Sequence, residues 1–159
     1  MIDDIFCKSY INWKKEGKIL FENKYAYSIL SVTPALPLHS IIITKRHIEL
    51  EQEFKKEEAK GVFDAINKTF ESLKILNKKQ IKTFYTSLIQ NPPTSESINL
   101  AKEILIDPTL FDKLIAYNLG ANVGEEAGQL INHFHIHLFP VTKKGKGIVS
   151  MVREYHQTQ

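Results

Sequence analysis

Three of the six histidines in this 159-residue chain alternate with apolar residues near its C-terminal end. Side chains along a β-strand point to opposite faces in turn, so His133, His135 and His137 are predicted to share one face, about 6.5 to 7 Å apart. The apolar residues between them would occupy the other face and anchor the strand in the core. The imidazole face is then free to line a cleft.

Imidazoles in this arrangement are compatible with three roles. They could form a hydrogen-bonded polar surface with no further function. They could hold a metal ion, because alternating histidines on a strand can chelate zinc. They could also carry out phosphoryl or nucleotidyl transfer, in which a neutral imidazole attacks phosphorus and its neighbours donate to phosphate oxygens. The spacing of the histidines by itself leaves all three roles open.

The loop before the histidines adds a second motif. From Asn122 to Pro140 the two segments together read N-x-G-x-x-A-G-Q-x-x-x-H-x-H-x-H-x-x-P. This pattern resembles the signature of the histidine triad (HIT) family. The segment from Pro37 to His47, which ends in Lys-Arg-His, is similar to a second landmark of that family, and residues 145–155 look like its C-terminal segment. The resemblance covers most of the chain.

The resemblance implies an enzyme in which the central histidine, His135, attacks the α-phosphate of a nucleotide conjugate and forms a nucleotidyl-histidine intermediate. His133 and His137 would orient this ring or bind phosphoryl oxygens, and the uncharged amide of Gln129 would contact the phosphate. The catalytic residues predicted in this way are His135, His133, His137, His47 and Gln129. The predicted nucleotide-binding residues are Asn122, Gly128, Gln129, His137, Ser31, Phe6 and Ile29. His39 is expected to make a structural hydrogen bond.

The expected substrate is a purine nucleotide linked through a phosphoramidate or a phosphoanhydride, and the expected assembly is a homodimer, both by resemblance only. Within the same class, dinucleoside polyphosphate hydrolysis and nucleotidyl transfer are alternatives. From other classes, the alternatives are a nucleotide-binding or scaffold protein with weak catalysis and a metalloprotein that uses the three histidines as ligands. No cofactor is expected.

Three features depart from the family pattern. Ser31 stands where members usually have an acidic residue or asparagine that holds the ribose hydroxyls, so weak discrimination between ribose and deoxyribose is expected. Leu130 replaces a hydroxyl-bearing residue after Gln129. Asp4 and Cys7 occupy the place of a Cys-x-x-Cys pair in zinc-containing members, so no metal site is expected.

Strand and helix patterns along the chain predict the elements that position these residues. Two β-prone runs lie within residues 18–32, and a run of β-branched residues predicts a strand at 40–44. Apolar residues recur at helical spacing from about 55 to 76 and from 81 to 89, and a further helix is expected at 95–106. Strand patterns return at 114–119 and 133–140.

These elements predict a single α+β domain over residues 1–159, which the resemblance makes a HIT-like fold. It would contain an antiparallel sheet of about five strands, one long helix and an inserted pair of helices at about 79–109, with helices covering one face of the sheet. The inserted helices are expected to bury their apolar stripes against the domain or a dimer partner.

Composition and charge exclude several classes of protein. With 21 basic and 18 acidic residues the net charge is only +3, which argues against nucleic-acid binding through bulk charge. Cys7 is the single cysteine, so an intrachain disulfide is excluded and a reducing, cytoplasmic setting is expected. The acidic start does not resemble a secretory signal, and no apolar segment reaches the ~20 residues of a membrane helix. No membrane or specific nucleic-acid partner is expected.

Overall fold

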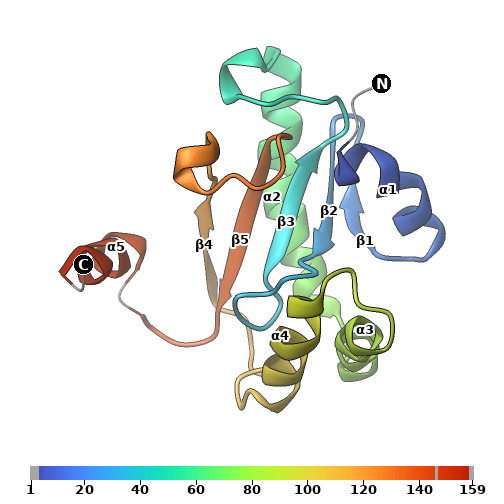
Figure 1. Ribbon diagram of the computed structural model, residues 1–159, viewed down its shortest axis with the longest axis vertical. Helices are drawn as coiled ribbons and strands as arrows, with labels where there is room; N and C mark the ends of the chain where they lie inside the picture. The colour runs from blue at the N-terminus through green and yellow to red at the C-terminus, as the bar shows by residue number, and fades with distance from the viewer. Residues whose placement is uncertain (1–3, 146, 158–159) are drawn as a thin grey trace.

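The computed structural model describes residues 4–145 and 147–157 and contains a five-stranded antiparallel sheet (Figure 1). The strands are β1 (Ile19–Glu22), β2 (Ala26–Leu30), β3 (Ser40–Thr44), β4 (Ala116–Gly120) and β5 (His135–Val141), in the spatial order β1-β2-β3-β5-β4. The central strands β2 and β3 are buried at every position. The α+β class and the antiparallel sheet predicted from the sequence are therefore confirmed.

The described residues also form five α-helices. They are α1 (Ile5–Lys15), α2 (Lys56–Ile75), α3 (Lys78–Gln90), α4 (Ser95–Ile106) and α5 (Ile148–Gln157). The apolar side of α2 packs on one face of the sheet, against residues such as Ile42 and Leu138. Helix α1 covers the opposite face, where Phe6 packs with Ile29 and Ile41. The sequence analysis did not predict α1. Because α1 covers the second face, the expectation that helices cover one face of the sheet is wrong.

Helices α3 and α4 pack against each other and against the end of the sheet (Figure 1). Ile81, Tyr85 and Leu88 from α3 and Ala101 and Ile104 from α4 are buried in the same apolar cluster as α2. This packing confirms that α3 and α4 are amphipathic and bury their apolar stripes within the domain, whereas their being an insertion relative to the family stays a prediction. Removing the pair would expose a large part of the core.

Helix α5 is set apart from the sheet in Figure 1. Its apolar side chains Ile148, Val149, Met151 and Val152 are exposed. Among the described residues, no helix is long and apolar enough to cross a bilayer.

The close contact between α2 and the chain before β2 makes Gly61 sensitive to substitution. A Cβ at this position would lie 2.6 Å from Tyr25 Cδ2 and 2.8 Å from Tyr25 Cβ. The gain in helix propensity of about 1 kcal/mol for alanine is smaller than the cost of moving backbone to relieve this overlap. We expect Gly61→Ala to lower the free energy of unfolding by about 1 to 3 kcal/mol, measured by urea denaturation. The exposed substitution Lys60→Ala is the control, and a more stable Gly61→Ala protein would contradict the prediction.

Candidate active site

Two of the three alternating histidines lie on β5. The strand begins at His135, and His133 precedes it in a bend, which corrects the expectation that the strand starts at residue 133. His135 and His137 pair with Ile43 and Ile41 of β3 and therefore point to the same face of the sheet. Their ring centroids are 4.9 Å apart.

One ring nitrogen of His135 is fixed by the backbone of the preceding bend. Its Nδ1 lies 2.8 Å from the carbonyl oxygen of His133, and because a carbonyl only accepts, this nitrogen carries the proton. In the neutral ring, Nε2 then holds a lone pair. Burial lowers the pKa of His135 below its ordinary value, so the ring is neutral at physiological pH.

The proton of His137 is placed by a second chain of hydrogen bonds. The N–H of Ala35 donates to His39 Nδ1 at 3.2 Å, so the proton of neutral His39 is on Nε2. His39 Nε2 lies 3.0 Å from His137 Nδ1 and donates to it, which leaves the proton of His137 on its own Nε2. The hydrogen bond expected for His39 is thus made to a catalytic candidate, and His137 presents a donor.

Helix α3 supports the loop that carries His39. Leu38 has a left-handed backbone with φ of 61°, a conformation that is unfavourable for a residue with a Cβ. Its N–H donates to the buried hydroxyl of Tyr85 at 2.8 Å. This bond holds the turn immediately before His39 in place.

His135 and His137 line a cavity of about 370 Å³ between α1, the sheet, the start of α4 and the loop before β5. Five other residues predicted from the sequence to bind a nucleotide share this lining: Phe6, Ile29, Ser31, Asn122 and Gly128. Three predicted catalytic residues, His133, His47 and Gln129, are not part of it. The cavity is therefore lined by most of the residues predicted to bind a nucleotide. Of the predicted catalytic residues, only His135 and His137 line it.

Hydrogen bonds from its own side chains stabilise the loop before β5. Asn122 Nδ2 donates to the carbonyl of Gly128 at 3.1 Å, and Gly128 has a left-handed φ of 85° that favours glycine. Gln129 Oε1 accepts from the N–H of Gly124 at 2.8 Å, and its Nε2 donates to the carbonyl of Ile131 at 3.2 Å. Both ends of the Gln129 amide are engaged within the loop, so this side chain shapes the loop in the free protein.

Ser31 lies at the end of β2 and is almost completely buried. Its Oγ accepts from the N–H of Thr33 at 3.2 Å and closes a tight turn. The hydroxyl keeps one proton to donate and one lone pair, so Ser31 by itself cannot accept from two ribose hydroxyls at once.

His133 is part of a separate buried cluster. Its Nε2 donates to the carbonyl of Thr44 at 2.8 Å, and its Nδ1 lies 3.2 Å from Asp4 Oδ2. His47 Nδ1 lies 2.9 Å from the same carboxylate oxygen. Because both ring nitrogens of His133 are occupied, the group that acts on His135 is the backbone carbonyl of His133 and not its imidazole. This differs from the expected contact with phosphoryl oxygens.

Asp4 connects this cluster to α1. Its Oδ1 caps the helix by accepting from the N–H groups of Phe6 and Cys7 at 2.7 and 3.0 Å. Burial alone would raise the pKa of Asp4, but hydrogen bonds from Cys7 and His133 outweigh it and hold this pKa well below its usual range. The carboxylate is therefore charged at neutral pH.

The donor atoms of Asp4, Cys7, His47 and His133 lie within 4.8 Å of one another. One carboxylate oxygen, one sulfur and two imidazole nitrogens are ligand types that zinc accepts, so the set fits such an ion. Burial, followed by the neighbouring Asp4 carboxylate, raises the pKa of the Cys7 thiol to about 11, so a metal would have to displace a proton there. The absence of a metal site stays a prediction. An ion held by these residues would tie α1 to the bend before β5 and take no part in chemistry at His135.

Several residues of the cavity were not identified from the sequence. Trp13 enters from α1, and Thr94 and Glu96 enter from the start of α4. The signal for α1 was present, since Asp4 is a favourable N-cap and Phe6, Tyr10 and Trp13 follow at helical spacing. No local sequence pattern indicates that the start of α4 lines the same cavity as His135 and His137.

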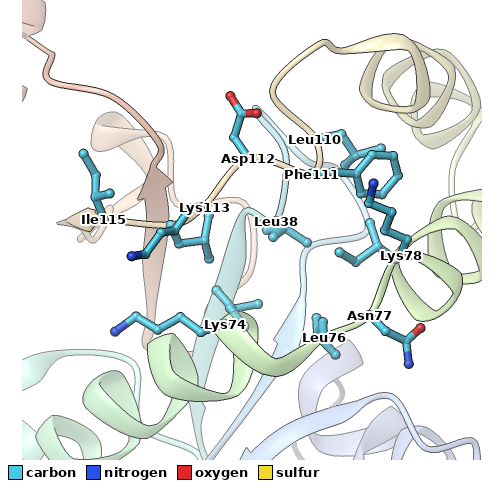
Figure 2. Close-up of a pocket in the computed structure, with 13 residues that line it drawn as sticks. Leu38, Lys74, Leu76, Asn77, Lys78, Leu110, Phe111, Asp112, Lys113 and Ile115 are labelled. Atoms are coloured by element: carbon cyan, nitrogen blue, oxygen red, sulfur yellow. The ribbon is translucent and has the colours of Figure 1, made fainter.

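A second hollow, of about 800 Å³, lies between the end of α2, the start of α3 and the segment before β4 (Figure 2). Its floor is apolar, and Lys74, Lys78 and Lys113 are on its rim. None of the histidines line it. The candidate active site is therefore the smaller cavity at His135 and His137.

A model of the HIT domain family matches residues 12–144. The chain belongs to the HIT family. An uncharacterized HIT-like protein of Methanocaldococcus jannaschii is 26% identical to it over 136 residues, which span 86% of this chain and 77% of that protein. The protein named Hit of Bacillus subtilis is 27% identical over 143 residues, which span 90% of this chain and 74% of that protein.

Solved structures agree with this family assignment at the level of the fold. A histidine triad nucleotide-binding protein from Candida albicans is 19% identical and matches with a TM-score of 0.54, covering 98% of this HIT chain and 94% of that chain. A HIT family hydrolase from Clostridium thermocellum is 22% identical with a TM-score of 0.50, covering 93% and 98%. The HIT fold expected from the sequence is confirmed.

Proposed function

We propose that this HIT protein is a nucleotide hydrolase that acts on the α-phosphate of a phosphoramidate or phosphoanhydride conjugate. The observation that carries the proposal is the protonation and hydrogen bonding of the His135 ring. Its Nδ1 is bound to the carbonyl of His133, and its Nε2, in a ring that burial keeps neutral, has a lone pair and no hydrogen-bond partner among the described residues. An imidazole prepared in this way is a nucleophile at neutral pH.

In the first step, the Nε2 lone pair of His135 forms a bond to the α-phosphorus. The bond from phosphorus to the leaving nitrogen or oxygen breaks, and the leaving group departs with the electron pair and takes a proton from solvent. His137 assists, because its Nε2–H can donate a hydrogen bond to the departing atom as negative charge develops there. The product is a nucleotide joined to His135.

In the second step, water attacks the phosphorus of this intermediate. The bond between phosphorus and Nε2 breaks, its electron pair returns to the ring, and the proton lost by water passes to solvent. The free nucleotide leaves and His135 is restored. An acceptor other than water would turn the same intermediate into a nucleotidyl transfer.

A substrate panel with trapping of the intermediate tests the proposal. Adenosine and guanosine 5′-phosphoramidates and diadenosine polyphosphates labelled at the α-phosphorus are incubated with the protein and quenched in alkali. We expect turnover of at least one conjugate and transient label on the protein at His135, located by mass spectrometry. Turnover without any labelled protein would contradict the covalent intermediate.

His137 and His39 should take up a proton at a lower pH than free histidine does. Burial, together with repulsion from neighbouring histidines, lowers the pKa of His137 to about 4 and that of His39 to about 3, against an ordinary value near 6.5. Burial also lowers the pKa of His135, the proposed nucleophile, so we expect the loss of kcat/KM in acid to have its midpoint below pH 6.5. A loss with a midpoint near pH 6.5 would show that the nucleophile is an unperturbed imidazole.

Stability should change in the same acid range. In the unfolded chain His39 and His137 bind protons near pH 6.5, whereas in the folded protein their pKa values are lowered to about 3 and about 4, so protons favour the unfolded state between these values. The free energy of unfolding should therefore fall as pH drops from 6.5 towards 4. Denaturation measured across this range keeps the loss of fold separate from the loss of chemistry.

We also propose a homodimer that works in the cytoplasm on purine nucleotide conjugates. The exposed apolar residues of α5 and the position of β4 at the edge of the sheet provide surfaces for a second copy. The lone cysteine suits a reducing compartment. Sedimentation velocity over a range of concentrations tests the dimer, and a monomer at all concentrations would contradict it.

A further inference from the structure

We infer that Glu96, on the inserted helix α4, binds the ribose hydroxyls of the nucleotide and supplies the carboxylate that the end of β2 lacks. The inference rests on the proposed function, because it assumes that a nucleotide occupies the cavity at His135. It replaces the expectation, drawn from Ser31, that ribose and deoxyribose are distinguished only weakly.

The start of α4 is a fixed part of the cavity wall. Pro93, Thr94 and Glu96 line the same cavity as His135 and His137. The backbone here is held by an N-cap, in which Thr94 Oγ1 accepts from the N–H of Ser97 at 3.2 Å, and Ser97 is fully buried. The N-cap therefore fixes the backbone from which the Glu96 side chain extends.

Glu96 is the one acidic residue among the side chains that line the cavity, and no lysine or arginine lines it. The histidines there are neutral, since burial lowers the pKa of both His135 and His137. No hydrogen bond or ion pair joins Glu96 to another described residue. A carboxylate on the wall of this cavity repels a phosphate and can accept hydrogen bonds from the donors of a bound ligand in place of water.

A vicinal diol meets this need better than the other parts of a nucleotide. The phosphate belongs at His135 and His137, and the apolar residues Phe6, Trp13 and Ile29 offer a surface for the base. Adjacent hydroxyls can donate to the two oxygens of one carboxylate, which a single serine cannot accept. Ser31 Oγ already accepts from the N–H of Thr33 and has one lone pair left, so it cannot accept from both hydroxyls, whereas Glu96 brings two carboxylate oxygens to the same cavity.

The test compares Glu96→Gln with wild-type protein on adenosine 5′-phosphoramidate and its 2′-deoxy and 3′-deoxy analogues. Glutamine keeps the shape and removes the charge, and Glu96 is exposed, so the variant should fold. We expect the KM for the ribonucleotide to rise roughly tenfold, the KM for the deoxy analogues to change less than about twofold, and kcat to stay within about twofold. Calorimetric binding of AMP and dAMP should show the same loss of preference without turnover.

The control is Glu103→Gln, an exposed carboxylate on the same helix that does not line the cavity, and it should leave the preference for ribose unchanged. An unchanged preference in Glu96→Gln, with turnover intact, would overturn this inference alone. A changed preference for AMP over IMP with no change between AMP and dAMP would also overturn it, because Glu96 would then bind the base. A wild-type protein that neither binds nor cleaves any of these nucleotides would overturn the proposed function as well.

Discussion

Replacing His135 with alanine should reduce nucleotide turnover by at least about a thousandfold while the protein stays folded. The imidazole is the proposed nucleophile, and its loss removes the covalent route, which leaves only the binding of substrate by the cavity. The ring makes one hydrogen bond, to the carbonyl of His133, so its removal leaves no buried charge unpaired. Steady-state kinetics and calorimetric binding of AMP measure the two consequences separately.

His135→Asn is the matched variant. An asparagine amide retains a donor for the His133 carbonyl but has no nucleophilic nitrogen, so it should preserve the bend before β5 and still lack activity. Binding of AMP should remain within a few-fold of wild type in both variants. Turnover above about a tenth of the wild-type rate in either variant would contradict the role of His135 as nucleophile.

The second large effect is expected at His137 and should depend on the leaving group. Its Nε2–H is the donor that stabilises charge on the departing atom, and removing one such donor costs about a hundredfold in kcat. We expect His137→Ala to lose about this much on an amine or nucleotide leaving group. On a nucleoside 5′-phosphate ester of p-nitrophenol, which needs little assistance, the loss should be less than about tenfold.

Equal losses on good and poor leaving groups would mean that His137 only shapes the cavity. His39→Gln provides the comparison, because it can still donate towards His137 Nδ1 while losing the ring. If the tautomer of His137 is what matters, His39→Gln should retain most of the activity that His137→Ala loses. An ¹⁵N spectrum of the histidine side chains should report protonated Nε2 in both His39 and His137 of the wild-type protein.

The strands and the alternating histidines could be predicted from the sequence because their signals are local. The alternation around His135 and the β-branched run at 40–44 reflect the two-residue period of a strand, and the run at 40–44 coincides with β3. The spacing of apolar residues predicted α2 and both inserted helices to within a few residues. Helix α1 was missed because Asp4 and Cys7 were interpreted as a degenerate metal motif and not as a helix cap followed by the first turn.

The roles of the individual histidines were decided by tertiary structure. In the sequence, His133 and His137 are equivalent neighbours of His135. In the fold, Thr44 and Asp4 occupy both nitrogens of His133, whereas His39 occupies only Nδ1 of His137 and leaves its other nitrogen to donate. These partners lie between 89 and 129 residues away along the chain, so no local pattern could assign them.

By itself, the sequence determined that His135 and His137 share one face of an antiparallel strand, because residue type and a period of two are properties of a short segment. Only the tertiary structure decided which nitrogen of the His135 imidazole is free and what surrounds it. A histidine tautomer is set by the donor or acceptor that packs against the ring, and the charge in a cavity is set by whichever elements form its wall. Here those are the carbonyl of His133 and the inserted helix that carries Glu96.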